Sequence, residues 1–151
     1  MKLIELKKIP SSFPDFKFSF SKGASKKDIQ YLIELYEKPI PQDLIDILTF
    51  SNGFELFNDD NLGGVQFLNV KEIHKINQEQ KNIYGEDWIN DILIFAYMIG
   101  EGNHIGLKLK TKNQYELLDC FHEEAPKSWQ KIPGSIQTLL SKLVKNQGKI
   151  F

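Results

Sequence analysis

The chain has 151 residues, of which 41% are hydrophobic and 26% are charged, a balance typical of a folded globular domain. Its formal net charge of −1 gives no global attraction to nucleic acid or to an anionic membrane. All 19 basic residues are lysine, which excludes the bidentate arginine contacts used to read DNA bases or to grip phosphates.

The N-terminal region predicts an extended segment. Residues 1–10 carry lysines, but an acidic residue interrupts their short apolar stretch and no small-residue cleavage site follows, so we expect a cytoplasmic protein without a signal peptide. Three phenylalanines alternate with polar residues over 16–20, which is strand periodicity. We therefore expect residues 1–22 to form an extended arm or strand against a body of residues 23–151.

Two helices are predicted next. Ser25 opens an S-x-x-D capping box, and apolar residues follow at positions i, i+3, i+4 and i+7. Pro41 suits the first turn of a second helix over residues 42–51, and Asn52-Gly53 supplies a left-handed stop.

The second half of the chain is dominated by predicted strands. These cover residues 65–70, 92–99, 104–110 and 115–121. Residues 71–84 are polar with a thin apolar stripe and are either a surface helix or a long excursion, while residues 135–145 form a closing amphipathic helix. The order predicts one α+β domain, with an antiparallel sheet of about four to six strands packed by two N-terminal helices and a C-terminal helix.

The stretch FAYMIGEGNHIGLKL, residues 95–109, resembles a dinucleotide fingerprint because Gly100, Gly102 and Gly106 form G-x-G-x-x-x-G. The spacing is wrong by one residue, and the residues after Gly106 alternate with period two instead of opening a helix. Gly100 and Gly102 therefore indicate a tight turn between two strands, and we expect no nucleotide cofactor.

The segment from Asp119 to Glu124 carries the densest set of reactive side chains, DCFHEE. Cys120 and His122 would share one face if the strand continued, which would give two ligands of a metal site or a thiol–imidazole pair. A single short segment seldom converges four metal ligands, and a lone cysteine in an apolar strand is more often a small buried hydrophobe. We expect neither a metal nor a catalytic residue in this chain.

Acidic residues recur in the predicted loops. Ordinary solvation explains most such residues, but a negative face can also steer a basic partner. The candidate partner-binding residues are Asp59, Asp60, Glu86, Asp87 and Glu101, with further carboxylates at Asp91, Glu123 and Glu124.

The order of elements resembles the SUKH superfamily, which includes bacterial toxin-immunity proteins and the yeast regulator of cell-wall glucan synthesis. Residues 23–56, GASKKDIQYLIELYEKPIPQDLIDILTFSNGFEL, carry the resemblance: a glycine, a capped helix, a proline-ended loop and a helix closing on Asn-Gly. The strand–glycine turn–strand ILIFAYMIGEGNHIGLKL and the helix SIQTLLSKLV match the later part of the family pattern. The turn departs from that pattern, because Glu101 and Asn103 stand where aspartate is common.

This resemblance implies a non-enzymatic protein-binding module. The leading expectation is an immunity-type protein that sequesters a cognate toxin, such as a basic nuclease or deaminase. One alternative is a regulatory scaffold in cell-wall or signalling pathways. A second alternative is a thiol- or metal-dependent hydrolase built on Cys120 and His122. Specific nucleic-acid binding and membrane binding are not expected.

Overall fold

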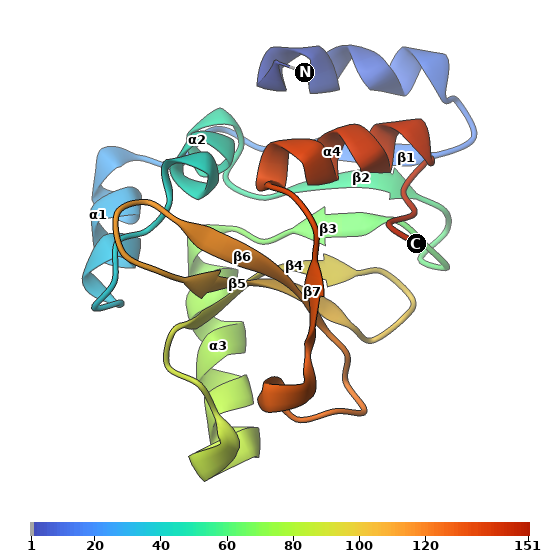
Figure 1. Ribbon diagram of the computed structural model, residues 1–151. Helices are drawn as coiled ribbons and strands as arrows, with labels where there is room; N and C mark the ends of the chain where they lie inside the picture. The colour runs from blue at the N-terminus through green and yellow to red at the C-terminus, as the bar shows by residue number, and fades with distance from the viewer. Residues whose placement is uncertain (1) are drawn as a thin grey trace.

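The computed structural model describes residues 2–151, and within them seven strands form one antiparallel sheet (Figure 1). The order of the strands across the sheet follows their order along the chain. The strands are β1 (Lys17–Phe20), β2 (Phe54–Asn58), β3 (Val65–Phe67), β4 (Ile92–Met98), β5 (His104–Leu109), β6 (Tyr115–Cys120) and β7 (Gln130–Ile132).

The helices fall into two groups around this sheet (Figure 1). In one group, α2 packs against both α4 and η1, and in the other, α1 packs against α3, which lies on β4. The helices are η1 (Leu3–Ser12), α1 (Lys26–Glu34), α2 (Gln42–Phe50), α3 (Val70–Tyr84), η2 (Gly85–Asp87), η3 (Pro126–Ser128) and α4 (Ile136–Lys145), where η marks a 3-10 helix. In the described range, no helix combines the length and the apolar character required to cross a bilayer.

The prediction of an α+β chain with an antiparallel sheet is confirmed, but the expected four to six strands are too few. β2 and β7 were not predicted from the sequence. β7 has three residues, two of them exposed, so it shows no usable alternation. β2 reads FELFN and is buried at four of five positions, which hides the period-two pattern of a half-exposed strand.

The N-terminal region is not wholly extended. Residues 17–20 form β1 and pair with β2, but residues 3–12 form the 3-10 helix η1. A 3-10 helix repeats every three residues, so Leu3, Leu6 and Ile9 share one side that packs on the core. That spacing was present in the sequence and was overlooked. A division of the chain at residues 22 and 23 stays a prediction.

Helix α3 settles the choice between a helix and an excursion for residues 71–84. Asn69 caps it, with its side chain accepting a hydrogen bond from the Glu72 backbone N–H and the Glu72 side chain accepting one from the Asn69 N–H. Asn77 is buried and exchanges two hydrogen bonds with the backbone of Ile94, at 2.8 and 2.9 Å. This buried amide fixes α3 to β4 beside an irregularity in the pairing of β4 with β5.

The order of the strands also decides which loops are neighbours. In an antiparallel sheet of consecutive strands, every second connection lies at the same end of the strands. The β2–β3 loop, the β4–β5 turn and the loop after β6 therefore lie at the same end of the sheet. The C-terminal tail lies beside the β2–β3 loop (Figure 1). This end of the sheet carries three of the five candidate partner-binding residues, Asp59, Asp60 and Glu101.

Candidate protein-binding site

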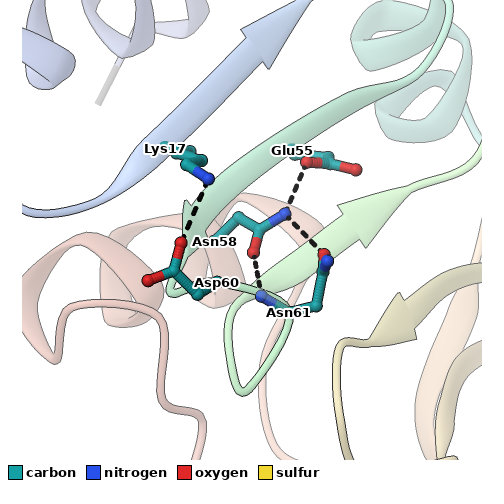
Figure 2. Close-up of polar contacts among 5 residues, drawn as sticks. All are labelled: Lys17, Glu55, Asn58, Asp60 and Asn61. Carbon is teal, nitrogen blue, oxygen red and sulfur yellow. Dashed lines mark hydrogen bonds and ion pairs between the residues drawn. The ribbon is translucent and has the colours of Figure 1, made fainter.

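The β2–β3 loop, residues 59–64, is tied down by side chains at its base (Figure 2). Asn58 is 8% exposed, and its Oδ1 accepts a hydrogen bond of 2.8 Å from the Asn61 backbone N–H. Its Nδ2 donates to Glu55 at 2.9 Å and to Asn61 Oδ1 at 3.3 Å. Lys17 of β1 forms an ion pair of 3.0 Å with Asp60. These contacts give the loop one defined conformation.

The backbone of the same segment is strained. Asp60 and Asn61 have φ of 47° and 64°, which these residue types tolerate, but Phe57 has φ of 54°. The fully buried Phe57 ring is held edge-on by three phenylalanine rings, Phe13, Phe16 and Phe18, at centroid distances of 4.9 to 5.4 Å. Aromatic packing of this kind offsets part of the backbone cost.

The β4–β5 turn packs directly on the β2–β3 loop. The Ile99 N–H donates a hydrogen bond of 3.0 Å to the Gly64 carbonyl. Gly100 has φ of 82°, and a Cβ at this position would lie 2.7 Å from the carbonyl oxygen of Leu62. The prediction that the glycines mark a turn is confirmed, and the close approach gives Gly100 a second role.

Because the loop and the turn are in contact, Asp59 and Glu101 line the same cleft. The cleft has a volume of about 520 Å³ and is also lined by Leu62 and by the C-terminal tail. Both carboxylates are on exposed residues, and neither makes an ion pair within 4 Å among the described residues. No direct ion pair among these residues therefore neutralises either carboxylate on this wall.

The other three candidate residues have different surroundings. Asp60 lies in the same loop, but it forms an exposed ion pair with Lys17 and does not line the cleft. Glu86 and Asp87 lie in η2, which follows the C-terminal end of α3 far from the β2–β3 loop (Figure 1), and neither residue lines the cleft. That end packs on the loop after β6, where Tyr84 donates a hydrogen bond of 3.2 Å to the Glu124 carbonyl. The structure thus places Asp59 and Glu101 in a cleft group and Glu86 and Asp87 in an α3-end group, while Asp60 belongs to neither.

The pKa of Asp119 is affected by other carboxylates at this end of the sheet. Burial raises the pKa of its carboxyl, and the charges of Glu101 and Glu124 raise that pKa further. Like charges held this close repel one another, so a partner's ammonium or guanidinium placed among them would lower the energy of the site.

Across the described part of the chain, the Cys120 thiol and the His122 imidazole have separate hydrogen-bond partners and are not bonded to each other. β6 ends at Cys120, and the chain turns before His122, whose exposed ring bonds to Asn103 with Nδ1 2.6 Å from Oδ1. Cys120 is 2% exposed, and burial, with the charge of Asp119, raises the pKa of its thiol well above the usual value. A thiol in this state is a poor nucleophile. Within residues 2–151, no cluster of three or more metal-ligating side chains is present.

The family comparison agrees with this architecture. The family model of the SMI1 / KNR4 family (SUKH-1) matches residues 23–142, which is most of the chain. The chain belongs to the SUKH-1 family. No individual curated protein matches it. In this SUKH-1 domain, the match contains the β2–β3 loop and the β4–β5 turn but stops before the C-terminal tail that completes the cleft.

Two apolar residues that line the cleft were not predicted from the sequence. Leu62 is 80% exposed and Phe151 is 79% exposed, and both line the cleft. Leu62 had a signal, because it is the one large apolar residue in the polar run NDDNLGG. Phe151 had none, because its position depends on how the tail folds back beside the β2–β3 loop.

Proposed function

We propose that this chain is an immunity-type protein of the SUKH-1 family, a non-enzymatic cytoplasmic module that binds a basic toxin and blocks it. The observation that carries the proposal is the presence of Asp59 and Glu101, neither of which forms an ion pair among the described residues, on one wall of a preformed cleft. Clustered carboxylates of this kind steer a basic protein and add specificity to its binding.

The surroundings of the two carboxylates support this reading. The β2–β3 loop that carries Asp59 is fixed by Asn58, so little conformational freedom is lost when a partner binds. Membership of SUKH-1 supports a binding role in general, and the resemblance to toxin-immunity proteins supports this one. A regulatory scaffold is the alternative within the same class of function.

The buried thiol weighs against the hydrolase alternative. We expect native Cys120 to react with iodoacetamide far more slowly than the same thiol in the urea-unfolded chain, because burial disfavours the thiolate. Equal rates in the two states would reopen the thiol mechanism.

The partner is tested by an affinity pull-down from the native host with tagged protein. A stoichiometric nuclease or deaminase toxin would support the immunity proposal. Recovery of cell-wall or signalling enzymes alone would contradict it and favour the scaffold.

The site is tested with two charge-reversal variants of equal charge change. We expect Asp59→Lys with Glu101→Lys to slow association with the recovered toxin by about tenfold or more at low salt. The matched control is Glu86→Lys with Asp87→Lys, which changes the α3-end group and should slow association much less. Equal slowing by both variants would show that only the net charge matters, and no slowing would place the interface elsewhere.

A further inference from the structure

The two most exposed large apolar side chains of the described residues meet at the same cleft. Leu62 and Phe151 are 80% and 79% exposed, and both line it. Isolated apolar residues on a surface need no explanation, but two at one concave site resemble the anchor regions of protein interfaces. Ile83, at 70% exposure, lies near the end of α3 and does not line this cleft.

The floor of the cleft is preformed. It includes Phe57, Phe16 and Met98, and the Phe57 ring is fixed in the phenylalanine cluster. The tail reinforces this floor, because a Cβ at Gly148 would lie 2.7 Å from the Phe57 Cβ. Ile150 is 1% exposed and anchors the tail in the core. A partner group entering the cleft would meet a shaped surface and would not have to order it.

The charges around the cleft have both signs. Asp59 and Glu101 come from the β2–β3 loop and the β4–β5 turn, whereas Lys145 and Lys149 come from the end of α4 and the tail. Within residues 2–151, none of the four forms an ion pair within 4 Å. A uniformly basic surface would be attracted by the two carboxylates and repelled by the two lysines. The cleft is therefore complementary to a segment of mixed charge.

We propose that the cleft binds a protruding peptide segment of the partner protein. This segment carries an apolar side chain that packs on Leu62 and Phe151, with a lysine or arginine facing Asp59 and Glu101 and an acidic residue facing Lys145 and Lys149. The inference rests on the proposed function, in which the end of the sheet that holds the cleft binds a protein, and it adds the chemistry of the contact.

The test uses a library of random twelve-residue peptides displayed on phage and selected against the full chain. We expect enriched peptides in which an apolar residue stands close to a lysine or arginine and to an aspartate or glutamate. The free peptides are then titrated against each variant by fluorescence polarisation. Leu62→Ser should weaken binding about tenfold, as the loss of a buried leucine contact implies.

The matched control is Ile83→Ser, which removes an exposed apolar side chain away from the cleft and should leave the affinity within about twofold. Charge reversal tests the orientation of the peptide. Asp59→Lys should weaken binding, and exchanging the peptide's basic residue for glutamate should restore part of that loss. Each variant is used only if its urea unfolding midpoint matches that of the wild type.

Three outcomes would overturn the proposal: no enriched peptide, enriched peptides without the mixed-charge pattern, or an affinity that Leu62→Ser leaves unchanged. A concentration-dependent dimer that Leu62→Ser dissociates would also overturn it, because the occupant would then be a second copy of the chain. Peptide binding at the cleft with no toxin in the pull-down would contradict only the immunity function. A toxin slowed by Asp59→Lys with Glu101→Lys but indifferent to Leu62→Ser would contradict only the peptide cleft.

Discussion

The β2–β3 and β5–β6 loops reverse the chain with the same backbone conformation but differ in their side chains. Each contains two consecutive non-glycine residues with positive φ, Asp60 and Asn61 in one and Lys112 and Asn113 in the other. The β5–β6 loop, residues 110–114, is exposed and entirely polar. The β2–β3 loop has a buried asparagine at its base and an exposed leucine near its tip. The side-chain contacts of the two loops also differ: Asn113 of the β5–β6 loop accepts a hydrogen bond from the Gln42 backbone N–H at the start of α2, whereas Asn58 holds the β2–β3 loop, which forms part of the cleft.

The largest expected effect comes from filling the space beneath the β2–β3 loop. Gly64 has φ of 104°, and a Cβ there would lie 2.4 Å from the Phe57 carbonyl oxygen. We expect Gly64→Ala to lower the free energy of unfolding by about 3 kcal/mol, through backbone strain and overpacking. Gly63→Ala is the control, because a Cβ there meets nothing within 4 Å. Urea denaturation measures both, and equal losses would contradict the role of this contact.

Asn58→Ala tests the polar tie that distinguishes the β2–β3 loop. It leaves the Asn61 N–H and the Glu55 carboxylate without their partner, so we expect a loss of about 2 kcal/mol in the free energy of unfolding. Amide hydrogen exchange at residues 59–64 should also accelerate. Gln114→Ala, in the β5–β6 loop, should change stability by less than about 0.5 kcal/mol. Unchanged exchange in Asn58→Ala would mean that the backbone alone holds the loop.

The raised pKa of Asp119, near Glu101, should make the stability of the fold depend on pH. Because the folded pKa of Asp119 is raised, this carboxyl favours folding at acid pH, and the contribution is lost as the pH rises through the folded pKa. We expect Asp119→Asn to raise the free energy of unfolding modestly at pH 7 and to change it little as the pH approaches 3.8, the ordinary pKa of aspartate.

An NMR titration of the Asp119 carboxyl separates the causes of this shift. Its pKa should fall in Glu101→Gln, which removes a neighbouring negative charge, and should stay above its ordinary value because burial remains. Glu123→Gln is the control with the same loss of charge. A fall of the same size in both variants would argue against a specific effect of Glu101.

The smallest expected effect concerns the ion pairs near the two loops. Lys17 and Asp60 are 73% and 76% exposed, so a double-mutant cycle with Lys17→Ala and Asp60→Asn should give a coupling under about 0.5 kcal/mol. Lys110 and Glu116, beside the β5–β6 loop, are less exposed and should couple slightly more strongly. A coupling above about 1 kcal/mol between Lys17 and Asp60 would make β1 a main support of the β2–β3 loop.

The sequence predicted those parts of the fold that carry local signals. The capping box at Ser25 and the strands β4, β5 and β6 are present near the predicted positions. Short or fully buried strands such as β2 and β7 lack such a signal, because periodicity needs length and one exposed face. The positive φ of Phe57 was not predicted, because it accompanies an irregularity in the pairing of β1 with β2 that has no local sequence signal.

The sequence offers the candidate carboxylates one by one and does not show which of them lie together. The five candidate carboxylates are on exposed residues, and Asp59 and Glu101 line the same cleft because the Gly100 backbone lies against Leu62. Asp60 looked equivalent to Asp59 until the structure paired it with Lys17, which is 43 residues away along the chain. Contacts of this kind depend on tertiary structure, which residue spacing does not encode.

The order of the sheet has a consequence for folding kinetics. Pairing β4 with β5 and β5 with β6 requires closing only short loops, whereas pairing β1 with β2 requires the chain to enclose α1 and α2 first. Since loop-closure entropy slows the formation of non-local contacts, we expect the central hairpins to be structured in the folding transition state and β1 to dock afterwards. The phenylalanines around Phe57 would then be assembled last, and the cleft would mature only at the end of folding.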